Sequence, residues 1–271
     1  MIDRVRYPID DLDGAVATSV INDARRQIAD IGAAELAGFV TPEGVAALVA
    51  DAASLAERAH WSGGVGTAYL ELPGDQWAPD HPRQRWMAYS VGAVGYDVIP
   101  LASPLRQIYE LEAVPRFIQR VLDRGTLFHY ADPCGALNLA VMREGDELQW
   151  HYDQTDFVVS LAVQPADVGG DFDVVPRIRD GADEHYDRVG ALLDGDESDV
   201  LTLAMTPGTL LIFEGRHSIH RVSPVSGPAT RYVGLLAYDT QPTTVSSELL
   251  REVRYGRATP FDSPPVTWPS S

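Results

Sequence analysis

The feature that most constrains the fold is a series of short apolar segments separated by glycine- and proline-rich turns, from about residue 127 to residue 238. Such segments are typical of β-strands, because a chain in a packed sheet reverses direction at turns that need Gly and Pro. The strands we predict are Leu127–Tyr130, Leu137–Met142, Leu148–Asp153, Phe157–Val163, Asp171–Pro176, Val200–Ala204, Thr209–Phe213, Ile219–Ser223 and Arg231–Tyr238. This series of strands predicts a double-stranded β-helix, or jelly roll.

The first part of the chain is predicted to be mainly helical. Thr41 followed by Pro42 marks a helix start, because a Thr side chain caps free N–H groups of the first turn and Pro fits that turn. The predicted helices are Val16–Ile31, Val45–Arg58, Ser103–Glu112, Pro115–Arg124 and, inserted in the barrel, Asp183–Leu193, with a short strand at Ala37–Val40. The predicted fold class is therefore mainly β with α, a jelly-roll core with an N-terminal helical layer.

The length of 271 residues suits one domain. We divide it into a helical layer over residues 1–125, a jelly-roll core over residues 126–240 and a C-terminal extension over residues 241–271. The segment His60–Arg85 is rich in Gly, Pro and Trp and has no clear period. Long irregular segments in compact domains are often lids over a site, so this segment is either a lid or an ordinary surface loop.

Composition argues against several classes of function. The chain carries 39 Asp and Glu residues against 21 Lys and Arg, a net charge of −18, whereas nucleic acids and anionic membranes are bound by basic clusters. The single cysteine, Cys134, allows no disulfide within the chain, and the N-terminus lacks the apolar core of a signal peptide. We expect a cytoplasmic protein with a small-molecule substrate, without nucleic-acid or membrane partners, and the sequence leaves a homodimer open.

A candidate metal site begins at His151 and Asp153, two residues apart on one predicted strand. Residues i and i+2 of a strand face the same side, so both side chains could point into one cavity. An imidazole and a carboxylate on one face are two thirds of the 2-His-1-carboxylate set that binds non-haem Fe(II). His-x-Asp alone is weak evidence, because it recurs by chance on surface strands.

A second stretch supplies the missing partners. The predicted strand Gly208–Phe213 leads to His220, and after a Pro/Gly turn Arg231 opens the returning strand. This order could bring His220 and Arg231 into the same barrel as His151. His217 competes with His220 for the distal position, but the following Arg-Val-Ser-Pro-Val context and the spacing to Arg231 favour His220.

These stretches resemble the Fe(II)/2-oxoglutarate-dependent oxygenase superfamily, in which His-x-Asp, a distal His and a later Arg occur in this order. Within that superfamily the chain is similar to the group of lysine halogenases and related amino-acid hydroxylases, over roughly residues 85–257. The stretches that carry this closer resemblance are Gly145–Asp153, Gly169–Phe172, Arg216–Val222 and Tyr255–Arg257.

The resemblance implies Fe(II), 2-oxoglutarate and O2 as cofactors, with iron bound by His151, Asp153 and His220. Arg231 would bind the distal carboxylate of 2-oxoglutarate, because a guanidinium is planar, always charged and able to bond bidentately. Asn138 or Thr209 would either add a hydrogen bond to 2-oxoglutarate or have a purely structural role.

Substrate contacts are less constrained by the sequence. Gln154, next to the metal pair, and Asp239, at the end of the Arg231 strand, lie near the expected mouth of the barrel. Arg85, Trp86 and Tyr89 could close over the site. For each of these residues the alternative is an ordinary surface or core position.

The resemblance implies an oxygenase that hydroxylates an unactivated C–H bond of a small polar metabolite, such as a free amino acid or a derivative. The alternatives are a hydroxylase of a peptidyl residue in a partner protein and a non-catalytic jelly-roll binding module. In the halogenases of the group a small residue replaces the carboxylate ligand and a halide binds there. Asp153 keeps the carboxylate, so hydroxylation is expected, and the sequence leaves desaturation or ring closure open.

Overall fold

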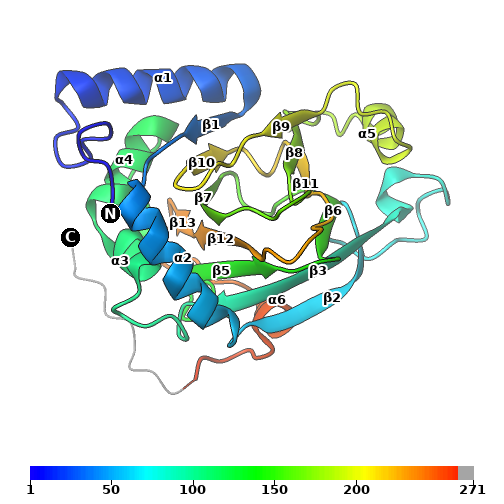
Figure 1. Ribbon diagram of the computed structural model, residues 1–271. Helices are drawn as coiled ribbons and strands as arrows, with labels where there is room; N and C mark the ends of the chain where they lie inside the picture. Colours follow the sequence, from blue (N-terminus) through cyan, green and yellow to red (C-terminus); the bar gives the residue numbers. More distant parts are fainter. Residues whose placement is uncertain (262–271) are drawn as a thin grey trace.

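One long strand, β3 (Trp86–Gly95), joins the two walls along the lower side of the barrel in Figure 1. The structure is a computed structural model that describes residues 1–261. Along one edge β3 pairs with β2 (His60–Thr67). Along the other edge, residues 92–95 pair with β5 and residues 89–90 pair with β6. Because one strand takes part in both walls, it fixes how they face each other.

The two walls are antiparallel sheets of unequal size, with the strand orders β1-β10-β7-β12-β5 and β6-β11-β8-β9. The larger wall consists of β1 (Ala33–Leu36), β10 (Leu210–Phe213), β7 (Val158–Gln164), β12 (Arg231–Leu236) and β5 (Leu137–Met142). The smaller wall consists of β6 (Glu147–His151), β11 (Ile219–Val222), β8 (Phe172–Val175) and β9 (Leu201–Leu203). A separate pair is formed by β4 (Phe128–His129) and β13 (Tyr238–Asp239).

Side-chain alternation along the strands separates two apolar cores. On β5, for example, Ala140 and Met142 belong to the cluster inside the barrel, whereas Leu139 and Val141 belong to the cluster outside it. Residues of a strand point alternately to its two faces, so the larger wall must be covered on both sides. The apolar strands of this wall are thus explained by two buried faces.

Four helices cover the outer face of the larger wall (Figure 1). They are α1 (Ala15–Ile31), α2 (Pro42–Ala56), α3 (Pro104–Glu110) and α4 (Ala113–Leu122). The start of α2 follows the sequence prediction, since Thr41 Oγ1 accepts a hydrogen bond of 3.2 Å from Gly44 N and Pro42 occupies the first turn. Gly32, with φ of 67°, ends α1 in the left-handed conformation that glycine adopts without strain.

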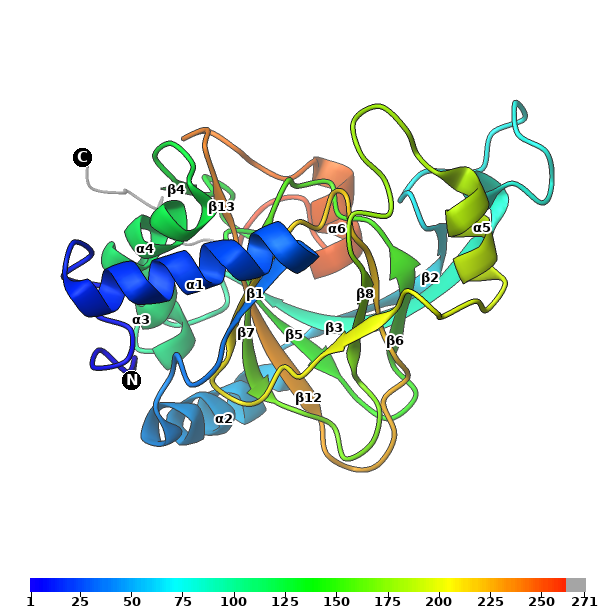
Figure 2. The same cartoon turned by 90° about the horizontal axis from the view of Figure 1, so that it is seen from above.

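The smaller wall has its own cover on the outer face. Helix α5 (Tyr186–Leu193) packs there together with Ala68 and Tyr69, which follow β2. A 3₁₀ turn, η1 (Pro82–Gln84), leads from the segment after β2 into β3. The last helix, α6 (Glu248–Tyr255), lies at one end of the barrel, and Figure 2 places it opposite the turn between β11 and β12.

The predicted jelly-roll class with a helical layer is confirmed, while several local predictions were wrong. The strand expected at Ala37–Val40 lies earlier, at β1, because Gly38 with φ of 70° turns the chain there. Part of His60–Arg85, expected to be irregular, is strand β2. Glycines weaken the sequence signal of β2, although its backbone pairs with β3 along its length.

The predicted division of the chain overlooked elements at both ends. The first 125 residues supply β1, β2 and β3 to the barrel in addition to helices. The expected C-terminal extension contains α6, and its residues 262–271 lie outside the described part of the chain. None of the helices within residues 1–261 has the length and apolar character needed to cross a membrane.

The contact between β12 and α3 generates a prediction about stability. A Cβ atom at Gly234 would lie 2.5 Å from Leu105 Cδ1, and Leu105 is buried. The substitution Gly234→Val should therefore destabilise the fold by about 1–3 kcal/mol through overpacking, measured by urea unfolding. Gly125→Val is the matched control, because no atom lies within 4 Å of a Cβ there. Equal stability of the two variants would show that the helices do not press on β12 at this position.

Candidate metal centre

The two predicted histidines face each other across neighbouring strands of the smaller wall. In the antiparallel pair β11–β6, His220 is directly opposite His151. The register shifts between this pair and the next, Val222 with Leu148, which indicates a β-bulge in β6. The bulge adds a residue between Leu148 and His151, so it changes the side to which His151 points.

His151, Asp153 and His220 converge, with potential ligand atoms all within 4.8 Å of one another. The geometry differs from the prediction in one respect, because β6 ends at His151 and Asp153 lies beyond it. The backbone N–H of Asp153 instead donates a hydrogen bond of 3.1 Å to Gly215 O, just after β10. Asp153 is thus positioned by a loop contact and not by strand alternation.

Hydrogen bonds orient both imidazole rings for metal binding. His151 Nδ1 is 2.7 Å from Gln149 O and His220 Nδ1 is 2.9 Å from Ser218 O. A backbone carbonyl can only accept, so Nδ1 carries the proton in each ring and Nε2 is the atom left to bind a metal. Such contacts to the ring nitrogen that does not bind the metal are a usual feature of metal-binding histidines.

Electrostatics favour a neutral His151 and an ionised Asp153, the protonation states in which these two groups can bind a metal ion. Burial and the nearby His220 lower the pKa of His151 to about 4, so this ring is neutral at neutral pH. Burial raises the pKa of the Asp153 carboxyl, but the charge and hydrogen bond of His220 together with the charges of His151 and Arg254 outweigh burial and lower it to about 2. Burial lowers the pKa of His220, and the Asp153 carboxylate, 3.2 Å from Nε2, reverses the shift and raises it. A metal ion would replace the proton that these two groups share.

The surroundings of the three side chains are closely packed. Phe172 stacks on the His220 ring at 5.5 Å between centroids, and Phe213 meets it edge-on at 5.0 Å. A Cβ atom at Gly215 would lie 2.5 Å from Asp153 Oδ2, so only glycine leaves the carboxylate in this place. Sequence reasoning missed Gly215, although its position directly after an apolar strand and before His217 was a usable signal.

Arg231 lies inside the barrel without a carboxylate partner. Only 6% of the residue is exposed, and burial lowers the pKa of its guanidinium to about 10. Within residues 1–261 its recorded hydrogen bond is to Met142 Sδ, at 3.6 Å, and no carboxylate oxygen lies within 4.0 Å. A buried cation is costly unless an anion pairs with it, so this position suits a ligand carboxylate.

Thr209 and Asn138, the other predicted 2-oxoglutarate contacts, are both buried but are placed differently. Thr209 Oγ1 is 2.9 Å from Thr206 Oγ1, so it has a protein partner. Asn138 lies at the opposite end of the β5–β12 pair from Arg231, opposite Leu235. Asn138 Oδ1 is buried and has no hydrogen-bond partner in the described residues.

The predicted substrate contacts are spread around the barrel. Arg85 forms an ion pair of 2.7 Å with Asp194 after α5, and Asp239 accepts hydrogen bonds from residues 240 and 244. Gln154 is exposed, and so is Trp86, at the start of β3.

Tyr89 and His217 complete the placement of the predicted residues. Tyr89 lies on β3 opposite Gly64. His217 is outside the converging set, and its carbonyl accepts a hydrogen bond from Arg179 N.

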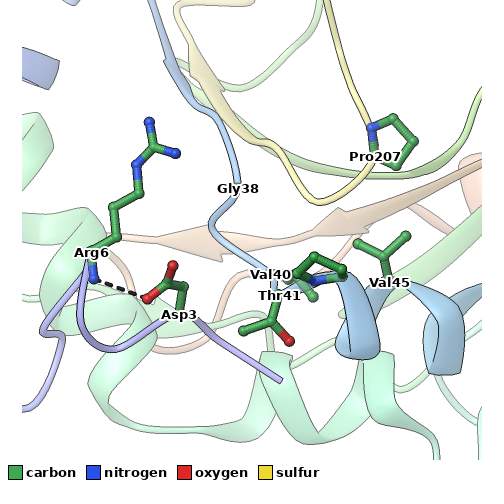
Figure 3. Close-up of a pocket in the computed structure, with 8 residues that line it drawn as sticks. Asp3, Arg6, Gly38, Val40, Thr41, Val45 and Pro207 are labelled. Carbon is green, nitrogen blue, oxygen red and sulfur yellow. Dashed lines mark hydrogen bonds between the residues drawn. The ribbon is translucent and has the colours of Figure 1, made fainter.

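A surface hollow of about 440 Å³ lies elsewhere on the molecule (Figure 3). It is lined by Asp3, Arg6 and Thr41, among others, near the start of α2. The acidic residue in this lining is Asp3. Figure 3 shows that its carboxylate accepts a hydrogen bond from Arg6 N. None of the converging metal-binding residues contributes to this hollow.

Comparison with solved structures shows the same fold at low sequence identity. The carbocyclase SnoK from nogalamycin biosynthesis, described as non-haem and α-ketoglutarate-dependent, has a TM-score of 0.57 at 14% identity, covering 89% of this chain and 93% of SnoK. An oxidoreductase of the 2OG-Fe(II) oxygenase family from Burkholderia pseudomallei has a TM-score of 0.51 at 16% identity, covering 82% and 91%. A prolyl hydroxylase from Trichoplax adhaerens, in complex with a hypoxia inducible factor peptide, has a TM-score of 0.52 at 15% identity, covering 81% and 89%.

Comparison with sequences gives a more specific result. No curated protein matches the chain. The Halogenase D family, in contrast, matches residues 88–254, which include both walls of the barrel from β3 onward and the converging His151, Asp153 and His220. The oxygenase resemblance drawn from the sequence is confirmed by this match together with the fold. Because the match spans more than half of the chain, the protein belongs to the Halogenase D family.

Proposed function

We propose that this protein is an Fe(II)- and 2-oxoglutarate-dependent oxygenase that hydroxylates a small polar metabolite, a free amino acid or a derivative. The observation that carries the proposal is the converging set of His151, Asp153 and His220, in which both Nδ1 atoms bond to backbone carbonyls and both Nε2 atoms are turned toward the Asp153 carboxylate side of the set. Two neutral imidazoles and one carboxylate are the donor set that non-haem Fe(II) oxygenases use.

The residues present fit the implied cofactors. His151, Asp153 and His220 would hold Fe(II), and the unpaired guanidinium of Arg231 would hold the distal carboxylate of 2-oxoglutarate, whose charge it needs. When bound, iron with 2-oxoglutarate and O2 supplies the oxidising power that an unactivated C–H bond requires. Phe172 and Phe213 keep the His220 ring in a dry, fixed position.

Hydroxylation is the outcome that Asp153 supports. The carboxylate would fill the iron position that halide takes in the related halogenases, and its negative charge disfavours a second anion there. Gly215 leaves room for this carboxylate and its carbonyl fixes the backbone of Asp153. The local fold is therefore adapted to a carboxylate at this position.

A small substrate is supported by the segment after β2, which lies beside the metal centre. The backbone N–H of Tyr152, between the two ligands His151 and Asp153, donates a 2.8 Å hydrogen bond to Ala68 O. Arg83 holds the segment by an ion pair of 2.6 Å with Glu71 and by stacking on the Tyr69 ring at 4.1 Å. A chain fixed this close to the site favours a compact substrate over an extended peptide.

The ligand assignment predicts different effects for two neighbouring histidines. His220→Ala should lose bound iron, because it removes one of three ligands, whereas His217→Ala should keep most of it. Iron content per protein, measured after anaerobic loading and gel filtration, is the test, with circular dichroism to verify folding. Loss of iron in the His217 variant and retention in the His220 variant would reverse the assignment.

The proposed contact of Arg231 with the distal carboxylate of 2-oxoglutarate predicts a change in 2-oxoglutarate affinity. Arg231→Ala should weaken 2-oxoglutarate binding by roughly one to two decades, the equivalent of about 1.5–3 kcal/mol for a hydrogen bond to a charged group, while iron stays bound. Titration of the visible absorption of the Fe(II)–2-oxoglutarate chelate measures this. Arg188→Ala is the control, because Arg188 pairs with Asp199 at the surface. Equal affinities in the two variants would exclude the proposed clamp.

Product identity tests hydroxylation. Turnover in high chloride should give a product with added oxygen and no chlorine, because Asp153 occupies the position that a halide would need. Mass spectrometry of the product distinguishes these outcomes. A chlorinated product from the unmodified protein would show that Asp153 leaves its position during the reaction.

A further inference from the structure

Asp153 is the metal-binding candidate that the sheet supports least. His151 and His220 lie on the paired strands β6 and β11, whose ladder fixes both backbones. Asp153 lies two residues beyond the end of β6, and its backbone is attached through the 3.1 Å hydrogen bond from N to Gly215 O. Contacts outside the ladder must therefore keep this carboxylate beside the two rings.

Arg179, in the segment after β8, is attached to the loop that follows β10. Its backbone N–H donates to His217 O at 3.4 Å, and its Nε donates to Arg216 O at 2.8 Å. Gly215, the acceptor for Asp153 N, comes directly before Arg216 in this loop. Arg179 therefore holds the backbone on which the Asp153 contact depends.

The guanidinium of Arg179 also contacts the other segment of the metal centre. It stacks on the ring of Tyr152, with 3.8 Å between Cζ and the ring centroid. Tyr152 lies between His151 and Asp153 in the chain, is buried, and has its ring centroid 5.2 Å from that of Tyr69. A single side chain thus joins the two segments that carry the metal-binding candidates.

Arg216 makes a second link between the same two segments. Its Nη2 donates to Gln154 O, and its Nε donates to Asp156 Oδ1 at 2.6 Å. Gln154 directly follows Asp153, so the residues on both sides of the carboxylate are held. Because Arg179 bonds to the Arg216 carbonyl, the two arginines form one continuous connection around Asp153.

A second arginine in the same cluster shows which contacts distinguish Arg179. Arg83 also pairs with Glu184, at 3.3 Å against 3.0 Å for Arg179, and their side chains are 16% and 15% exposed. Arg83 also stacks on a tyrosine, Tyr69, at 4.1 Å. Within residues 1–261, however, the recorded side-chain hydrogen bonds of Arg83 go to groups outside the loop after β10. Support of the aromatic cluster is common to both arginines, whereas the bond to this loop belongs to Arg179.

We propose that Arg179, assisted by Arg216, is a positioning residue that keeps the Asp153 carboxylate at the metal, by tying the turn at Tyr152 to the loop after β10. The proposal rests on the metal centre of the proposed function and deepens it by naming what holds its least supported ligand. This connection bears on the reaction outcome, because a carboxylate that leaves the metal frees the position that a halide would need.

A guanidinium is suited to this task. It is planar, so its face can stack on a ring while N–H groups at its edge donate hydrogen bonds. The ammonium of a lysine is a point charge, which could lie over Tyr152 or donate to Arg216 O but would not do both in this geometry. Glu184 compensates the charge, which leaves geometry as the contribution of Arg179.

The test is a cycle of variants whose metal affinity is measured. Co(II) is the probe, because it is stable in air and its visible absorption depends on its ligand geometry. Competition with a chelating dye gives the Co(II) affinity of the unmodified protein, Arg179→Met, Asp153→Ala and the double variant. Methionine keeps a long side chain and removes the guanidinium. Arg83→Met is the matched control, and urea unfolding without metal measures the stability of each variant.

Arg179→Met should weaken Co(II) binding by about 10- to 100-fold, the usual cost of losing a group that orients a metal ligand, and should change the visible spectrum. In the Asp153→Ala background the same substitution should have no effect, because the ligand through which Arg179 acts is gone. Arg179→Lys should restore part of the affinity. Arg83→Met should bind Co(II) like the unmodified protein, even if it unfolds more easily.

The Tyr152 ring provides an independent pair of variants. Its hydroxyl has no hydrogen-bond partner among the described residues, so Tyr152→Phe should keep the Co(II) affinity. Tyr152→Leu removes the stacked ring and should lose affinity as Arg179→Met does. If Arg179→Met does not fold, Arg216→Met decides, because Arg216 is exposed. It should weaken Co(II) several-fold when the Asp153 carboxylate is present and not when it is absent.

Equal losses of Co(II) affinity with and without the Asp153 carboxylate would overturn the proposal, because they would show that Arg179 supports the fold in general. An unchanged affinity in Arg179→Met, or an equal loss in Arg83→Met, would overturn it as well. Failure of the proposed function gives a different result, since the unmodified protein and His220→Ala would then bind Co(II) equally. In that case the role of Arg179 falls with the metal centre.

Discussion

The pairing of β11 with β6 is the interaction on which the candidate site depends. It brings together two histidines from distant parts of the chain, and the irregular register between His220 and Val222 sets the direction of His151. The helix α5 and the segment after β2 cover the outer face of these strands. This cover excludes water from the outer face of the smaller wall. The side chains of His151 and His220 therefore face only the interior of the barrel.

The interior of the barrel contains polar groups without protein partners at two separate places. Arg231 is buried near one end and Asn138 near the other, and the apolar side chains of Ala140 and Val233 lie between them. Buried polar groups without partners reduce stability. Ligand binding should therefore stabilise the folded state by linkage.

The sequence predicted the barrel well where strands are apolar on both faces. Leu137–Met142 was predicted with its observed limits, because six consecutive buried residues leave little ambiguity. Strand β2 was missed, since His-Trp-Ser-Gly-Gly-Val-Gly-Thr has exposed glycines and neither apolar alternation nor β-branched runs. The strand β2 is stabilised by its pairing with β3. This pairing is a tertiary contact, so it cannot be predicted from the local sequence of β2.

For the site, the sequence predicted the side chains of His151, Asp153 and His220, which converge in the structure, but not the backbone geometry that brings them together. The spacing of His151, Asp153, His220 and Arg231 could be recognised because each has a distinctive functional group. Gly215 was not recognised, because the signal of a glycine after an apolar strand is weak without the loop contact that it makes with Asp153. To recognise such a residue one must know which segments meet at the site. The β-bulge in β6 and the loop contact of Asp153 decide which segments meet, and both depend on the whole fold.

The double pairing of β3 has a consequence for how the chain acquires its structure. During synthesis β2 and β3 emerge before the strands that follow them, and their hairpin can form at once, but the second edge of β3 has no partner until residues 137–151 have been made. An unpaired strand edge is a template for association with other chains. Pairing at such sequence separation is also slow, because loop closure precedes the gain from contacts. The exposed Gly63 and Gly64 of β2, which obscured the strand in the sequence, leave little side chain on its outer edge for another chain to pack against, with Trp61 and Val65 as the exposed apolar exceptions.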